Sequence, residues 1–194
     1  MSLSLFNDVC QILWENRRFA DNAGNTCLVT VDGTDFQIYE PNPFWKGWWS
    51  HKFNGPGLRY EIAICILTGH IVWINGPFPC GACSDITIFR LGLKQMLDDG
   101  EMVIADRGYI GEPEHILTPY HLIADQDAAL RKTASVARSR HETGNRRLHM
   151  WGCLGQRWRH AVELHWIALH AVAVIEQLKF EEGEALFQFD YEEY

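Results

Sequence analysis

The sequence predicts one mixed α/β domain, in which helices flank a β-sheet. Its 194 residues are the length of a single domain. Apolar residues make up 47% of the chain and charged residues 22%, a globular balance that argues against wholesale disorder. Three strand patterns come first, and helix and strand patterns alternate after them. This order is typical of a sheet covered by helices.

The first elements are a helix and a strand. Residues 5–19 have loose helical spacing, and a turn-rich gap at 21–25 follows them. Residues 27–33, CLVTVDG, are expected to form a buried strand that enters a glycine turn. We therefore assign residues 1–26 to an N-terminal helical segment and begin the main domain, 27–180, at this strand.

The middle of the chain predicts a hairpin between two loops. Residues 40–57 form a loop rich in proline, glycine and aromatic residues. Residues 60–67 and 71–76 have the pattern of two strands joined at a Thr-Gly turn. A second loop at 76–85 leads into a helix expected near 86–97.

The second half predicts two strands, two helices and a tail. Strands are expected at 102–106, where the run ends on an acid, and at 121–125. Helices fit 134–151 and 160–179, and the second is apolar nearly all round, so we expect it to be buried. Six of the last 14 residues, 181–194, are acidic, which indicates an exposed tail.

Positive charge is concentrated in one part of an acidic chain. The formal net charge is −8, but residues 131–160 hold eight of the 17 basic residues and one acid, a local balance of +7. Such a stripe is typical of a face that binds a polyanion, although a solvated helix face has the same signature. The side chains that we assign to DNA binding are Arg138, Arg140, Arg146, Arg147 and His149.

The sequence indicates an intracellular protein. Its N-terminus, MSLSLFNDVC, has no basic region or long apolar run of a secretory signal, and no segment is a convincing membrane span. The six cysteines are scattered and are expected to be reduced thiols. Cys80 and Cys83 have CxxC spacing, but no second pair completes a zinc site, so we expect a loop with two thiols.

Three acids are placed where a crevice would form. Asp32 and Asp106 lie at the ends of predicted strands, and Glu142 lies on a predicted helix. Such carboxylates suit one or two divalent ions such as Mg²⁺ or Mn²⁺, and two such ions can cleave a phosphodiester bond. The alternative is that the aspartates only form turns before Gly33 and Gly108.

Four ordered blocks carry a resemblance to a known family. The blocks VDGT, GPFPCGACSDITIFR, IADRGYIGE and RSRHETGNRRLHMWGCL resemble those of the DDE-superfamily endonuclease domain, and are most similar to Harbinger (PIF) and IS5-like transposases. The resemblance covers about residues 27–178. It implies an RNase H-like fold, a five-stranded sheet with an antiparallel second strand, and metal-dependent cutting and joining of DNA. Carried over, the catalytic triad falls on Asp32, Asp106 and Glu142.

The chain also departs from that family, and this leaves two functions open. Related bacterial transposases carry a tyrosine and a lysine where Ser135 and His149 stand, while Arg138 matches their arginine. Only 31 residues precede Asp32, too few for a complete three-helix DNA-binding module. The chain is therefore expected to be a DNA endonuclease and strand transferase, or a domesticated, inactive module that binds DNA or protein. The resemblance also implies a nuclear location in a eukaryote, with a separate DNA-binding protein or a second copy as partner.

Two further features have more than one interpretation. Asp85 is either an auxiliary acid near the metals or, like Ser84, an N-cap residue for the helix that follows. The aromatic and basic loop around Trp45, Trp48 and Trp49 either contacts nucleic-acid bases or packs over the edge of the sheet.

Overall fold

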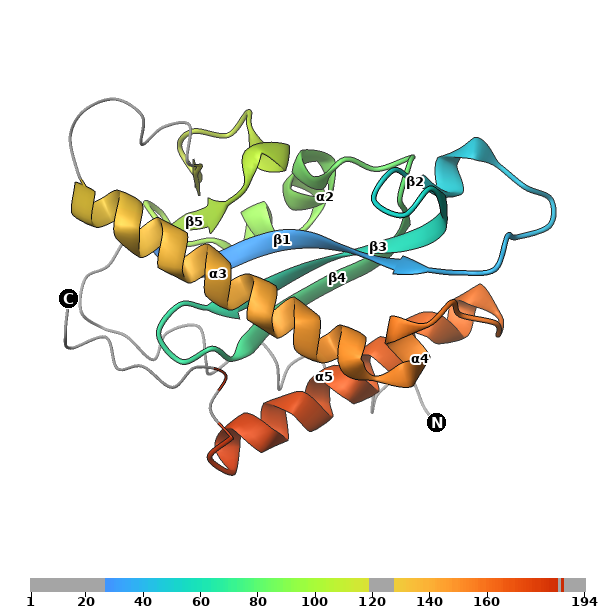
Figure 1. Cartoon of the computed structure of the whole chain (residues 1–194). Coiled ribbons are helices and arrows are strands. Elements are labelled where there is room, and N and C mark those ends of the chain that lie inside the picture. The colour runs from blue at the N-terminus through green and yellow to red at the C-terminus, as the bar shows by residue number, and fades with distance from the viewer. Residues whose placement is uncertain (1–26, 119–127, 185, 187–194) are drawn as a thin grey trace.

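The computed structural model describes residues 27–118, 128–184 and 186. The helix expected at 5–19 and the strand expected at 121–125 lie outside the described residues, as does most of the acidic tail. The described chain forms a mixed sheet flanked by helices, with strand order β4-β3-β1-β5-β6, and β2 also pairs with β3 (Figure 1). The strands are β1 Cys27–Gln37, β2 Trp49–Ser50, β3 Gly55–Cys65, β4 Ile71–Pro79, β5 Met102–Ala105 and β6 Ile116–Leu117.

The directions of the strands agree with the expected sheet. β3 is antiparallel to both β1 and β4, whereas β5 is parallel to β1 and β6 is parallel to β5. The second long strand is thus the antiparallel one. Six strands are described where four were expected within these residues, because two short strands were not expected: β2 pairs with the start of β3, and β6 pairs with β5.

The first strand is longer than the sequence predicts. A turn was expected at Gly33, but β1 continues through it in extended conformation to Gln37, so the predicted end of the strand is wrong. Gly33 pairs with Glu61 of β3, and this antiparallel ladder extends to Gln37. The neighbouring β5 does end early, because the parallel ladder stops at the pair Val31 and Ala105. Asp32 therefore lies where β1 loses one of its two neighbours.

The sheet separates two apolar layers. On one face, α3 (Ala128–Met150), α4 (Gly152–Gly155) and α5 (His165–Glu181) cover a core that includes Phe36, Tyr60 and Leu148. On the other face, α2 (Asp85–Leu91) contributes Phe89 to a core with Val31. Residues of β1 alternate between these two faces, as the two-residue period of a strand requires. In Figure 1, α3 crosses the sheet in front of β1, the strand that carries Asp32.

Helix α3 tolerates a glycine because it packs closely on the sheet. Gly144 lies inside its 23 residues, where glycine costs about 1 kcal/mol relative to alanine. A Cβ atom at this position would collide with Cδ1 of Ile64 on β3, and Leu186 packs beside the same point. The glycine thus lets the helix approach the strand that lies beside Asp32.

Helix α5 is half covered, whereas the sequence predicted that it would be fully buried. Leu169, Ala173 and Phe180 are in the core, but Ile167 and Leu178 are 37% and 53% exposed. The expectation was wrong because an apolar sequence all round a helix does not show which side the sheet covers. None of the helices in the described chain has both the length and the apolar character to cross a membrane.

Candidate active site

The register of two parallel strands brings two acids to the same edge. Val31 of β1 pairs with Ala105 of β5, and this is the last pair of their ladder. Asp32 and Asp106 are the next residues along the two chains, so they lie side by side where β5 ends and β1 continues beside β3 alone. The carboxyl ends of parallel strands are where α/β proteins bind ligands.

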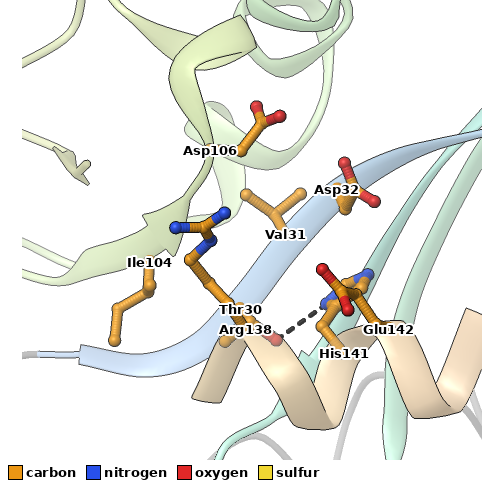
Figure 2. Close-up of a pocket in the computed structure, with 8 residues that line it drawn as sticks. All are labelled: Thr30, Val31, Asp32, Ile104, Asp106, Arg138, His141 and Glu142. Atoms are coloured by element: carbon orange, nitrogen blue, oxygen red, sulfur yellow. Dashed lines mark hydrogen bonds between the residues drawn. The ribbon is translucent and has the colours of Figure 1, made fainter. Parts of the chain in front are cut away.

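Helix α3 brings the third acid to the same place. Glu142 lines a cavity of about 80 Å³ together with Asp32 and Asp106, and Figure 2 shows Asp32 between the other two acids in this view. A cavity of this size holds one or a few water molecules or ions. Its lining residues are Thr30, Val31, Asp32, Ile104, Asp106, Arg138, His141 and Glu142.

The three acids share this cavity without converging on one point. Within the described residues, no three His, Cys, Asp or Glu side chains lie close enough to hold one ion. Their chemistry nevertheless suits a hard divalent cation, since carboxylate oxygens are the ligands that such ions prefer.

The acids repel one another across the site. The pKa of Asp32 is raised to about 6, chiefly by burial; the carboxylates of Asp106 and Asp85 contribute to this rise, and Lys52 opposes it. Nδ2 of Asn145, on α3, donates a hydrogen bond of 3.2 Å to Oδ2 of Asp32. A cation bound here would relieve the repulsion between the carboxylates.

Asp106 shapes the turn that follows β5. Its Oδ1 accepts a hydrogen bond of 2.7 Å from the backbone N–H of Gly108, at the start of a short 3₁₀ helix, Arg107–Tyr109. The turn-forming role considered from the sequence is therefore real for Asp106. The same residue also lines the cavity, so the two interpretations do not exclude each other.

Asp85 reaches the site from the other face of the sheet. A Cβ on Gly33 would collide with its Oδ1, and one on Gly108 would lie 2.6 Å from its Oδ2, so its carboxylate lies against both glycines. The N-cap of α2 is Ser84, so the N-cap interpretation of Asp85 was wrong. Burial raises the pKa of Asp85, and Arg59 and Lys52 oppose that rise.

An arginine holds Asp85 in this position. Nη1 of Arg59 lies 3.1 Å from Oδ1 of Asp85, and the same guanidinium donates to both carboxylate oxygens of Asp35 at 2.6 and 3.0 Å. Ser50 donates a further bond of 2.6 Å to Asp35. Burial raises the pKa of Asp35, but the hydrogen bonds from Arg59 and Ser50 outweigh this effect and keep the pKa below its usual value.

A match to a family model shows the family to which the chain belongs. The model described as DDE superfamily endonuclease matches residues 31–176, three quarters of the chain. The matched span contains the three acids of the cavity and Asp85. The chain belongs to the DDE superfamily endonucleases. Endonucleases of this superfamily have an RNase H-like fold, generally use divalent metals and act on DNA. No curated protein and no solved structure matches the chain.

The basic residues of this DDE endonuclease are divided among different surroundings. Arg138 lines the acidic cavity, and Arg146 is exposed on α3. Arg140 instead donates to the carbonyl of Ile66, at 3.3 Å. The expected basic face of α3 is therefore only partly directed at the acids.

Two other residues from the basic set face α5 or the core. Arg147 lies 3.6 Å from a carboxylate oxygen of Glu176 and packs over the ring of Phe180. The ring of His149 stacks on Phe36, with centroids 4.6 Å apart, and burial lowers the pKa of His149. Neither side chain is brought to the acidic cavity.

The Trp-rich loop, residues 44–53, has both buried and exposed aromatics. Trp48 packs against the core, whereas the ring of Trp45 lies over Gly47 and is 54% exposed. The adjoining Cys80 and Cys83 are free thiols. The loop thus packs at the sheet edge and still exposes an aromatic ring.

Sequence reasoning missed three residues of the site. Asn145 lies three residues after Glu142, and this helical spacing was a signal that could have revealed it. Arg59 and Lys52 gave no such signal, because the ion pair of Arg59 with Asp85 and the charge interaction of Lys52 with Asp32 join segments distant in the sequence.

The burial of Asp32 predicts a cost in stability. Its pKa is raised in the folded state, so ionising it opposes folding at every pH above its unfolded pKa near 4. The Asp32→Asn variant without metal is expected to be more stable than the wild type by about 2 kcal/mol at pH 8, and equally stable at pH 3.5. Urea unfolding at both pH values, with exposed Asp99→Asn as the control, measures this. An equal gain at both pH values would contradict an ionisation effect.

Proposed function

We propose that this chain is a transposase-type DNA endonuclease and strand transferase that uses a DDE triad and two Mg²⁺ or Mn²⁺ ions. The observation that carries the proposal is the shared cavity of Asp32, Asp106 and Glu142, which three separate elements bring together. Burial and, to a smaller extent, the nearby carboxylates of Asp106 and Asp85 raise the pKa of Asp32, and a cation at this place would favour its charged form.

Each acid has a distinct part in this proposal. Asp32, Asp106 and Glu142 would hold the two ions, with Asp32 as the ligand that both ions share. The ions would supply activation of the attacking hydroxyl and stabilisation of the leaving oxygen. Asn145 orients Asp32 through its 3.2 Å hydrogen bond. Arg138 in the cavity wall would bind a phosphate oxygen of the DNA.

The subfamily of the chain within the DDE superfamily is part of the same proposal. The ordered blocks from VDGT to RSRHETGNRRLHMWGCL support a Harbinger (PIF) or IS5-like transposase. A nuclear location, a separate DNA-binding partner protein and a homodimer would follow from that placement. The exposed Arg146 and the cavity residue Arg138 support a direct contact with DNA as well.

A domesticated module that binds without cutting is the second candidate. One observation favours it: the described acids do not yet form a set that could hold one ion. Such a module would bind DNA or a DNA-binding protein through its basic and aromatic side chains. It would have no requirement for Asp106.

A metal titration separates the two candidates. We expect calorimetry with Mn²⁺ to detect one or two ions on the wild type, and Asp106→Asn to lose this binding together with metal-dependent nicking of supercoiled DNA. Asp99→Asn, an exposed aspartate away from the cavity, is the matched control and should behave like the wild type. The titration is repeated with a short DNA duplex present, since DNA can complete such a site. No binding under either condition would reject the nuclease and favour the module.

A further inference from the structure

One cation of the Trp-rich loop lies next to the strand that carries Asp32. Lys52 lies in the turn between β2 and β3, and its Nζ donates a hydrogen bond of 2.6 Å to the backbone carbonyl of Gly33. Gly33 directly follows Asp32 on β1. Lys52 is therefore a positive charge at the edge of the sheet where the acids lie.

The backbone of Lys52 is fixed by the buried network behind the site. Its N–H donates a hydrogen bond of 3.2 Å to Oγ of Ser50, and Ser50 is bound to Asp35. The start of the loop is also tied down, because the N–H of Gly81 donates to the carbonyl of Gly47 at 2.8 Å. A ligand would thus meet a lysine that is already in place, which lowers the entropy lost on binding.

The ammonium of Lys52 retains capacity for a ligand. It has three N–H donors, and the carbonyl of Gly33 takes one of them. Its positive charge opposes the rise in the pKa of both Asp32 and Asp85. Nevertheless, among the residues that the structure describes, no carboxylate forms an ion pair with it, and the residue is exposed. Two donors therefore remain for an anion that approaches the acids.

We propose that Lys52 binds a phosphate oxygen of a nucleic-acid strand that lies across the mouth of the cavity, beside the bond that is cut. This inference rests on the proposed function and adds a substrate-binding residue to it. A strand backbone carries its negative charge on phosphates, and a lysine binds them as a point charge. Lys52 and Arg138 would then contact the strand from two different elements, the loop and α3.

Binding to a DNA duplex at several salt concentrations tests the role of Lys52. The Lys52→Gln variant is expected to bind about tenfold more weakly than the wild type. The slope of log affinity against log salt should also fall by about one, as expected for the loss of one phosphate contact. Lys52→Arg keeps the charge and should retain most of the affinity. Lys46→Gln removes an exposed lysine of the same loop and is the matched control.

A purely structural role of Lys52 gives a different result. In that case Lys52→Gln lowers stability in urea but leaves the DNA affinity and salt slope of the folded protein unchanged, which overturns the inference. If Lys52→Gln does not fold, Lys52→Met, which keeps the aliphatic stem, is measured for the same loss of affinity. If Lys52→Arg loses as much affinity as Lys52→Gln, charge is not what Lys52 supplies and the inference is also wrong.

The DNA-binding measurements, taken together with the Mn²⁺ titration and the cleavage assay, separate this inference from the nuclease assignment. If the wild type binds Mn²⁺ and cuts DNA, and Lys52→Gln binds DNA as tightly as the wild type, only the phosphate contact is rejected. If the wild type neither binds Mn²⁺ nor cuts DNA, but Lys52→Gln still loses affinity and salt slope, only the nuclease assignment is rejected. Wild type that does not bind duplex DNA rejects both.

Discussion

Replacing Arg59 with methionine is expected to lower the free energy of unfolding by about 3 kcal/mol at pH 7. Its guanidinium is bound to both carboxylate oxygens of Asp35 and lies 3.1 Å from Asp85. The side chain of Asp35 is only 1% exposed, so the variant would leave a buried charge without its partner. Breaking a buried ion pair costs far more than its net contribution, because desolvation is no longer offset.

The effect of Arg59→Met should depend on pH. Arg59 keeps the pKa of Asp35 low, so in the wild type this carboxylate stabilises the fold above its unfolded pKa, and the stabilisation is lost in acid. Without Arg59, burial raises the pKa of Asp35. The stability difference between wild type and variant should therefore shrink as the pH falls from 7 to 3.5.

An exposed ion pair provides the control for Arg59. Arg90 is ion-paired with Glu112 at 2.6 Å, but its side chain is 49% exposed. Arg90→Met should cost less than about 1 kcal/mol, since water screens such pairs. Urea unfolding of both variants at pH 7 and 3.5 gives the comparison. Equal losses in the two variants would mean that the Arg59 network adds no more than a surface pair.

The acids that local sequence could reveal are those that follow buried strands. Asp32 and Asp106 were predicted because apolar runs precede them, and the register of β1 and β5 then brings them side by side. The prediction that β1 ends at Gly33 was wrong, because Gly33 also fits an extended strand paired with β3. A glycine after an acid indicates a turn only when no neighbouring strand extends past it.

Contacts between distant segments decide roles that the sequence left open or missed. An aspartate at the start of a helix is a common cap, and only the contacts of Asp85 with Gly33 and Gly108 show another role. The spacing of His149 placed it on a helix face, but spacing cannot show that Phe36 covers this ring. The same holds for Arg147, which α5 turns away from the acids.

Replacing Gly33 with alanine is expected to lower both stability and activity through Asp85. The new Cβ would collide with Oδ1 of Asp85 and lie 2.9 Å from its Cγ, while Arg59 holds that carboxylate in place. Overpacking of this kind costs about 2 kcal/mol. Gly33 is in extended backbone inside β1, so the collision and not the backbone conformation sets the cost.

The double variant Gly33→Ala/Asp85→Ala isolates that collision. Without the Asp85 carboxylate the alanine has room, so adding Gly33→Ala to Asp85→Ala should cost less than about 0.5 kcal/mol. Urea unfolding of the wild type, both single variants and the double variant gives the coupling energy between the two positions. If the two single losses simply add, Asp85 does not lie against Gly33 and the geometry of the site is wrong.

Activity in the same four proteins shows whether Asp85 serves the proposed chemistry. Asp85→Ala is expected to reduce metal-dependent DNA cleavage by roughly 10- to 100-fold, the usual effect of losing a group that supports metal ligands. The double variant should regain the stability lost by Gly33→Ala but none of the lost cleavage. Full cleavage by Asp85→Ala would mean that the carboxylate only fills space between the glycines. Recovery of stability without recovery of cleavage would instead mean that Gly33 leaves room for the carboxylate of Asp85, and that this carboxylate supports the acids of the site.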